Sequence, residues 1–160
     1  MPRRSPLAFL VATWFGCGYA PIAPGTAGSL AAVVIAIALH YYGDYGRWTL
    51  LLLAAILMAP AIWAADVVAK QTNTIDPGIV VVDEVIGQWI TLAGAATFNW
   101  KTWLTAFLLF RVLDITKPGP ISWADRRDGP VGVMLDDVIA GAIGACVLWG
   151  VRLAWPGVVG

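Results

Sequence analysis

Long apolar runs that carry almost no charge restrict what this chain can fold into. Residues 26–42 and 48–65 contain no acid, lysine or arginine. Each approaches the roughly 20 residues that an α-helix needs to cross a bilayer. The short segment between them, residues 43–47, contains two glycines and an aspartate, which are typical of a tight turn. The two runs therefore predict a helical hairpin within a membrane.

The composition agrees with an integral membrane protein. Of the 160 residues, 59% are hydrophobic and only 12% are charged, whereas about 25% of residues are charged in a typical soluble domain. The ten lysines and arginines balance the ten acids, which argues against the basic surface of a nucleic-acid-binding protein. We expect residues 1–160 to form a single membrane-embedded all-α domain.

Three further segments are candidate spans. Residues 79–98 and 131–153 are apolar apart from acids near their starts, and residues 102–115 form the shortest candidate. Residues 7–15 predict an interfacial or re-entrant helix. The chain is thus expected to be a polytopic bundle of about four to five transmembrane or re-entrant helices. Tryptophans at the ends of the runs predict an interfacial aromatic belt: Trp48, Trp100, Trp103, Trp149 and Trp155.

The charges divide unequally between the two faces that five crossings would create. One face receives residues 1–25, 66–78 and 111–130, together with nine of the ten acids. Cytoplasmic segments of membrane proteins are enriched in lysine and arginine, so this face is predicted to be cytoplasmic. It holds seven of the ten cations: Arg3, Arg4, Lys70, Arg111, Lys117, Arg126 and Arg127.

Two adjacent pairs of acids, Asp83–Glu84 and Asp136–Asp137, interrupt otherwise apolar segments. A carboxylate at the bilayer centre costs about 2.5–3.5 kcal/mol, so these groups require compensation. Carboxylates without a suitable histidine or thiolate favour Mg²⁺ over Ca²⁺ or Mn²⁺. Small residues one turn later would let both helices approach one shared ion: Gly87, Ala140 and Gly141. Alternatively, each pair only caps the start of its helix.

Two other segments contain candidate phosphate-binding groups. In residues 110–127, Arg111 and Lys117 could bind an anion. Alternatively, this segment is a basic loop in which Arg111 only pairs with Asp114. Pro118 is predicted to end the helix that precedes the loop. The glycine- and proline-rich residues 16–29 precede the first span. There Thr26 or Ser29 could cap the helix, and free N–H groups could bind phosphate; the other interpretation is a rigid entry turn.

Four stretches together resemble the bacterial phosphatidylglycerophosphatase A family. They follow the family order over nearly the whole chain: Gly16–Leu30, Asp76–Gly87, Phe110–Ile121 with Asp125–Arg126, and Gly132–Gly141. The resemblance implies a Mg²⁺-dependent phosphatase of the bacterial inner membrane. Its phospholipid substrate would be phosphatidylglycerophosphate, and its products phosphatidylglycerol and inorganic phosphate. The active site would face the cytoplasm.

Combining the residues with the resemblance gives a specific hypothesis. Mg²⁺ is held by Asp83, Glu84, Asp136 and Asp137, and either Asp114 or Glu84 acts as general base. Direct attack by water is expected, with a transient aspartyl-phosphate as the open alternative. The phosphate is bound by side chains and backbone groups of two segments: Arg111, Lys117, Arg126, Gly25, Thr26 and Ser29. A competing hypothesis is a small ion or proton transporter with acids along its pathway.

Overall fold

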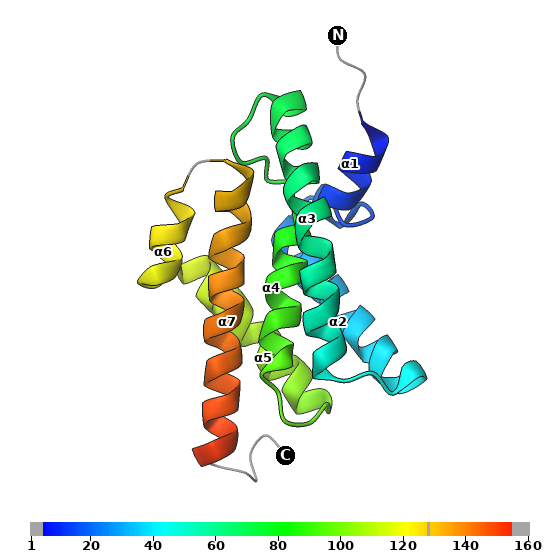
Figure 1. Ribbon diagram of the computed structural model, residues 1–160, viewed down its shortest axis with the longest axis vertical. Coiled ribbons are helices and arrows are strands. Elements are labelled where there is room, and N and C mark those ends of the chain that lie inside the picture. Colours follow the sequence, from blue (N-terminus) through cyan, green and yellow to red (C-terminus); the bar gives the residue numbers. More distant parts are fainter. Residues whose placement is uncertain (1–4, 128, 155–160) are drawn as a thin grey trace.

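A computed structural model describes residues 5–127 and 129–154, so Arg3, Arg4 and Trp155 lie outside the described residues. Over this part of the chain the protein is helical and contains no strand, which confirms the all-α prediction (Figure 1). The elements in chain order are α1 (Pro6–Ala12), η1 (Cys17–Tyr19), α2 (Pro24–Gly43), α3 (Arg47–Thr72), α4 (Val82–Ala93), α5 (Trp100–Thr116), α6 (Pro120–Asp125) and α7 (Pro130–Ala154).

Three of the described helices are long and apolar enough to cross a membrane, namely α2, α3 and α7. The predicted hairpin is confirmed as α2 and α3, which are joined by a short turn at Asp44. Helix α4 is much shorter than the predicted span 79–98. Its 12 residues extend only about 18 Å at 1.5 Å per residue, which is less than the hydrocarbon thickness.

Small residues occupy most of the buried positions of the two hairpin helices, while large apolar side chains of these helices are exposed. Glycine, alanine and serine make up most of the buried positions of α2, and alanine most of those of α3, whereas Leu52, Ile56 and similar residues are exposed. Small residues at helix contacts and an apolar exterior are typical of membrane bundles, in which lipid covers the outer surface.

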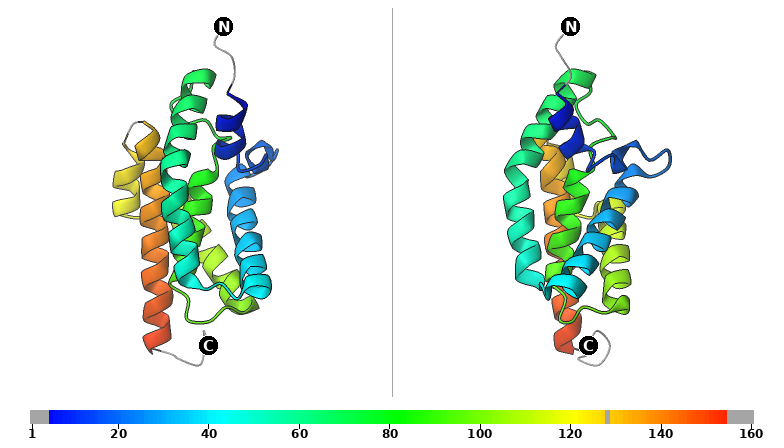
Figure 2. Two further views of the ribbon diagram at one scale, coloured as in Figure 1. Left: turned by 45° about the vertical axis from the view of Figure 1, so that its right-hand side comes forward. Right: turned by 90° about the vertical axis from the view of Figure 1, so that its right-hand side faces the viewer.

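Helix α4 lies at the centre of the bundle and packs most extensively against α7 (Figure 2). The two helices approach at Gly87 and Gly141, where a Cβ on Gly87 would lie 2.6 Å from the carbonyl oxygen of Asp137. The predicted close approach at small residues is therefore confirmed. The indole of Trp89 also donates a 3.0 Å hydrogen bond to the carbonyl of Ala32 on α2.

The segment before α4 enters the bundle without forming a helix. The N–H of Val81 donates a 2.9 Å hydrogen bond to the carbonyl of Ala12, and Val81 is fully buried. Gly18 and Gly28 allow this approach, because a Cβ on Gly18 would collide with the carbonyl of Ile79 and one on Gly28 would lie 2.9 Å from the Val81 side chain. As a result, α4 begins well below the end of α3 (Figure 1).

The helices alternate in direction, so their ends gather at two ends of the bundle. The starts of α2, α4 and α7, the ends of α3 and α5, and helix α6 lie towards one end, here called the site end (Figures 1 and 2). Trp48, Trp100 and Trp149 are exposed towards the opposite end. Trp103 does not join them, because it is buried and stacks on Phe98 at a ring separation of 4.8 Å.

Candidate metal and phosphate site

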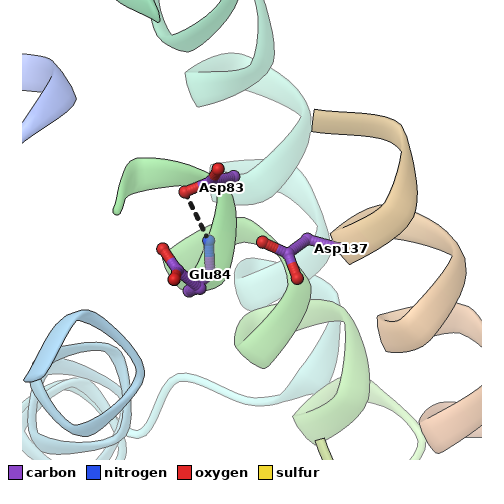
Figure 3. A group of neighbouring side chains, drawn as sticks. All are labelled: Asp83, Glu84 and Asp137. Carbon is purple, nitrogen blue, oxygen red and sulfur yellow. Dashed lines mark hydrogen bonds between the residues drawn. The ribbon is translucent and has the colours of Figure 1, made fainter. Parts of the chain in front are cut away.

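Five carboxylates from three helices converge on a cavity of about 360 Å³ at the site end. Asp83 and Glu84 come from the first turn of α4, Asp114 from the last turn of α5, and Asp136 and Asp137 from the second turn of α7. Figure 3 shows Asp83 and Glu84 on the first turn of α4 and Asp137 of α7 beside them. The close helix contact at Gly87 therefore brings together groups that are about 50 residues apart in sequence.

Helix capping accounts for only one of the two acid pairs. Helix α4 starts at Val82, so Asp83 and Glu84 lie in its first turn, where the helix dipole favours negative charge. The carboxylate of Asp83 also accepts a 3.0 Å hydrogen bond from the N–H of Glu84. Helix α7, however, starts at Pro130. Asp136 and Asp137 lie six and seven residues beyond it, so the capping alternative is wrong for that pair.

The carboxylate oxygens form two overlapping groups that could each hold a metal ion. The first group consists of Asp83, Glu84 and Asp137, and the second of Asp114, Asp136 and Asp137. In each group the potential ligand atoms lie within 4.8 Å of one another. Asp137 thus belongs to both groups, while Asp136 lies with Asp114 instead of joining Asp83 and Glu84.

Several oxygens in this cluster are buried without a hydrogen-bond partner. They are Glu84 Oε2, Asp136 Oδ1 and Asp137 Oδ1. A buried acceptor that lacks a partner costs about 1–3 kcal/mol, and more when it is charged. Because all the potential ligands are carboxylate oxygens, the cluster fits a hard divalent cation.

The guanidinium of Arg111 is held behind the carboxylates and does not line the cavity. Its Nη1 lies 2.7 Å from Asp114 Oδ2 and 4.0 Å from Glu84 Oε1. The predicted Arg111–Asp114 pair is therefore confirmed. The same nitrogen donates a 3.4 Å hydrogen bond to Ser29 Oγ. Arg111 thus connects α5 to α2 and to the first turn of α4.

Lys117 does line the cavity. Helix α5 ends at Thr116, just before Lys117 and the predicted helix-ending Pro118. The Lys117 ammonium lies 2.7 Å from Asp136 Oδ2 and also pairs with Asp125. Burial lowers the pKa of Lys117, but the hydrogen bonds to Asp125 and Asp136 outweigh that effect, so its pKa lies above the ordinary value. Lys117 is therefore a permanent positive charge at the cavity.

Of the two adjacent arginines after α6, the structure brings Arg127 to the cavity. Arg127 lines it and stacks its guanidinium on the ring of Trp123 at 4.1 Å. The predicted phosphate ligand Arg126 does not line the cavity and donates a 3.1 Å hydrogen bond to Ser122. The sequence did not identify Arg127 as a cavity residue. At the end of a helix, adjacent side chains point in different directions, and the sequence pattern alone does not determine which one faces the cavity.

The glycine- and proline-rich loop brings the start of α2 to the same cavity. Gly25 lines it, and a Cβ there would collide with Glu84 Oε1. The predicted capping by Thr26 or Ser29 is wrong, because Pro24 starts the helix and Ala23 occupies the cap position without a side-chain bond. Ser29 instead donates to the carbonyl of Gly25 at 3.0 Å. Thr26 is half-buried and does not line the cavity.

This arrangement can hold both a divalent cation and an anion. The carboxylates provide the cation ligands, while Lys117, Arg127 and the uncapped start of α2 provide positive potential. The buried carboxylates gather at one end of the bundle. A transporter would instead require acids through the depth of the membrane, so the described geometry favours a site for a phosphorylated molecule.

Comparisons with known proteins agree with this geometry. A sequence profile described as phosphatidylglycerophosphatase A matches residues 10–152. Phosphatidylglycerophosphatase A of Escherichia coli K12 is 40% identical to this chain, and the match covers 92% of this chain and 84% of the relative. The Haemophilus influenzae protein of the same name is 33% identical, and the match covers 89% of this chain and 87% of that relative. A Bacteroides thetaiotaomicron protein with the provisional name phosphatidylinositol-3-phosphatase is 41% identical, and the match covers 88% of this chain and 91% of the relative. No solved structure matches the chain.

Proposed function

The chain belongs to the phosphatidylglycerophosphatase A family, and from that membership we propose that it hydrolyses phosphatidylglycerophosphate to phosphatidylglycerol and inorganic phosphate. Membership makes it a membrane-embedded lipid phosphatase, an enzyme that acts on phosphoric monoesters. The observation that carries the proposed reaction is the convergence of five carboxylates, Lys117 and Arg127 on one cavity at the end of an apolar bundle.

The proposed cofactor is Mg²⁺, with ligands drawn from the predicted acids Asp83, Glu84, Asp136 and Asp137, and Asp114 lies beside the second pair. The support is the set of carboxylate oxygens, several of them buried and without a partner. Bound there, Mg²⁺ would polarise a phosphoryl oxygen and lower the pKa of a coordinated water. The residues themselves orient the ligands: Arg111 fixes Asp114 and Glu84, and Lys117 fixes Asp136.

The phosphate would be bound by Lys117, Arg127 and the N–H groups at the start of α2 near Gly25. Charge-assisted hydrogen bonds from such donors are about twice as strong as neutral ones. We assign Arg111, Thr26 and Ser29 to positioning, since none of them lines the cavity. Arg126 would contribute only long-range positive charge. Glu84 and Asp114 remain the two candidates for the general base that activates the attacking water.

The site end is proposed to face the cytoplasm of a bacterial inner membrane. In this orientation the headgroup enters the cavity while the acyl chains stay in lipid against the apolar exterior. By the helix ends on which they lie, the described cations of the site end are Lys70, Arg111, Lys117, Arg126 and Arg127, and those of the opposite end are Arg47, Lys101 and Arg152. An excess of lysine and arginine favours the cytoplasmic side.

The reaction is tested by measuring inorganic phosphate release from phosphatidylglycerophosphate. Protein purified in detergent should release phosphate with Mg²⁺ present and stop when the metal is chelated. Readdition of Mg²⁺ should restore the release. Absence of release from folded protein under both conditions would contradict the proposed activity.

Removing one charge from either acid pair tests the metal ligands. Asp83→Asn and Asp136→Asn should each lower the turnover rate about 100-fold or more, as expected when an electrostatic element of a catalytic site is lost. Arg47→Ala, on the opposite end, is the matched control and should retain wild-type turnover. Near-normal turnover of either acid variant would remove that residue from the proposed site.

The name of the Bacteroides relative favours a second candidate substrate, a phosphorylated phosphatidylinositol. Both candidates present a phosphomonoester on a lipid headgroup, so the same cavity chemistry applies to each. Comparing kcat/KM for phosphatidylglycerophosphate, phosphatidylinositol 3-phosphate and phosphatidic acid separates them. A higher value for the inositol lipid would replace the first proposal for the substrate.

A further inference from the structure

We infer that the cavity binds two divalent cations, with Asp137 shared between them and Asp114 a ligand of the second. This inference rests on the proposed function, because it specifies the metal content of the same site. It differs from the sequence-based hypothesis in two respects: one ion becomes two, and Asp114 moves from candidate base to metal ligand.

The first observation is the division of the carboxylates into two groups. Oxygen ligands of one hard cation lie up to about 4–5 Å apart, which is twice the metal–oxygen distance. Asp83, Glu84 and Asp137 meet this condition, and so do Asp114, Asp136 and Asp137. Among the described residues, only Asp137 belongs to both groups. One ion therefore accounts for three of the five carboxylates, and the second group offers three carboxylates to another ion.

The second observation concerns oxygens that the protein itself leaves without partners. Asp136 is 6% exposed and Asp137 is 3% exposed, yet Oδ1 of each lacks a hydrogen-bond partner, as does Oε2 of Glu84. Each group thus retains at least one buried and unpaired acceptor that is not shared with the other group. Lys117 and Arg111 bind different oxygens of the cluster, so they leave these acceptors free.

The net charge of the side chains around the cavity favours two divalent ions over one. The five carboxylates, three of them buried and two partly buried, face two cationic side chains, Arg111 and Lys117, which leaves an excess of three negative charges. One divalent cation would leave the site negative and repel a phosphate monoester. At the rim, Arg127 offsets Asp125, while Asp76 adds one further negative charge. Two ions would therefore neutralise the lining, so that it no longer repels the phosphate.

Arg111 has a specific part in this arrangement. It contacts Asp114 in one group and Glu84 in the other, so it connects the two groups in addition to the shared Asp137. Hydrolases with two metal ions typically keep them about 3.5–4 Å apart, so that both can contact one phosphoryl group. A shared carboxylate and a common arginine suit such a short separation.

Manganese binding tests the inference through a readout that does not depend on turnover. Equilibrium dialysis of detergent-purified protein should find two Mn²⁺ per chain, with an electron paramagnetic resonance spectrum of a spin-coupled pair. Asp114→Asn should retain one Mn²⁺ with the spectrum of an isolated ion. Glu84→Gln should lose the other site, so it provides a second test if Asp114→Asn does not fold. Asp66→Asn, which removes an exposed partner of Lys70, is the control and should bind two.

Two further outcomes distinguish this inference from the proposed function. One Mn²⁺ per wild-type chain, with metal-dependent phosphate release intact, would overturn the two-ion arrangement and leave the phosphatase proposal standing. Phosphate release that is insensitive to chelation, with no Mn²⁺ bound, would overturn the metal site as a whole.

Discussion

At the scale of single residues, the adjacent arginines after α6 offer a sharp test of phosphate binding. Both are exposed, so neither substitution should unfold the protein. Arg127→Ala should raise KM about tenfold, because a charge-assisted hydrogen bond is worth roughly 1.5–3 kcal/mol and this one lies at an exposed rim. Arg126→Ala should change KM less than about twofold. Steady-state kinetics with a phospholipid substrate measures both, and a larger effect for Arg126→Ala would reverse the assignment.

Residue identities at the site were partly predictable from sequence. The two acid pairs stood out because charge is costly inside apolar helices, and both pairs do reach the cavity. Asp114 was less conspicuous as a ligand, because a partner three residues away, Arg111, already explained its charge. The grouping of Asp136 with Asp114 depends on how α5, α6 and α7 pack, which spacing along one segment does not determine.

At the scale of elements, the contact between α4 and α7 sets the position of Asp137. A Cβ on Gly87 would press on the ring of Phe110 and on the Asp137 backbone. Gly87→Ala should therefore lower the free energy of unfolding by about 1–3 kcal/mol, as overpacking of a close contact does, and should lower turnover as well. Thermal unfolding in detergent provides the first measurement and phosphate release the second.

The control for this contact is Gly150→Ala on α7, where a Cβ would meet no atom within 4 Å. It should leave unfolding unchanged or raise the unfolding temperature slightly, because alanine favours helix more than glycine does. If Gly87→Ala were equally harmless, the close approach of α4 and α7 would not be what fixes the carboxylates.

Sequence patterns predicted the long helices better than the short ones. Helices α2, α3 and α7 follow from hydropathy and length alone. Helix α4 was predicted too long, because Ile79, Val80 and Val81 are apolar and suit either a helix or a buried extended segment. Their conformation is decided by tertiary contacts, including the hydrogen bond to Ala12 and the close approach at Gly18 and Gly28. Non-helical backbone at membrane depth is stable only where protein or water surrounds it.

At the scale of the whole molecule, the orientation of the bundle can be measured by cysteine labelling. In a Cys17→Ser, Cys146→Ser background, Thr74→Cys follows the end of α3 at the site end, and Tyr42→Cys lies in the last turn of α2 at the opposite end. A membrane-impermeant maleimide applied to spheroplasts should label Tyr42→Cys and spare Thr74→Cys, because the site end is proposed to be cytoplasmic. Lysis should make both reactive. Labelling of Thr74→Cys in intact spheroplasts would place the cavity on the outer side.

The central position of α4 has a consequence for how the protein is made. Helix α4 is short and has two acids in its first turn, and its most extensive contact is with α7, which follows it in the chain as the last of the described helices. A short segment with charged residues partitions poorly into lipid by itself. During translation, α4 can pack against α2 and α3 as soon as it is made, but its most extensive contact has to wait for α7. Chains that stop before α7 would leave the side of α4 that carries Gly87 uncovered.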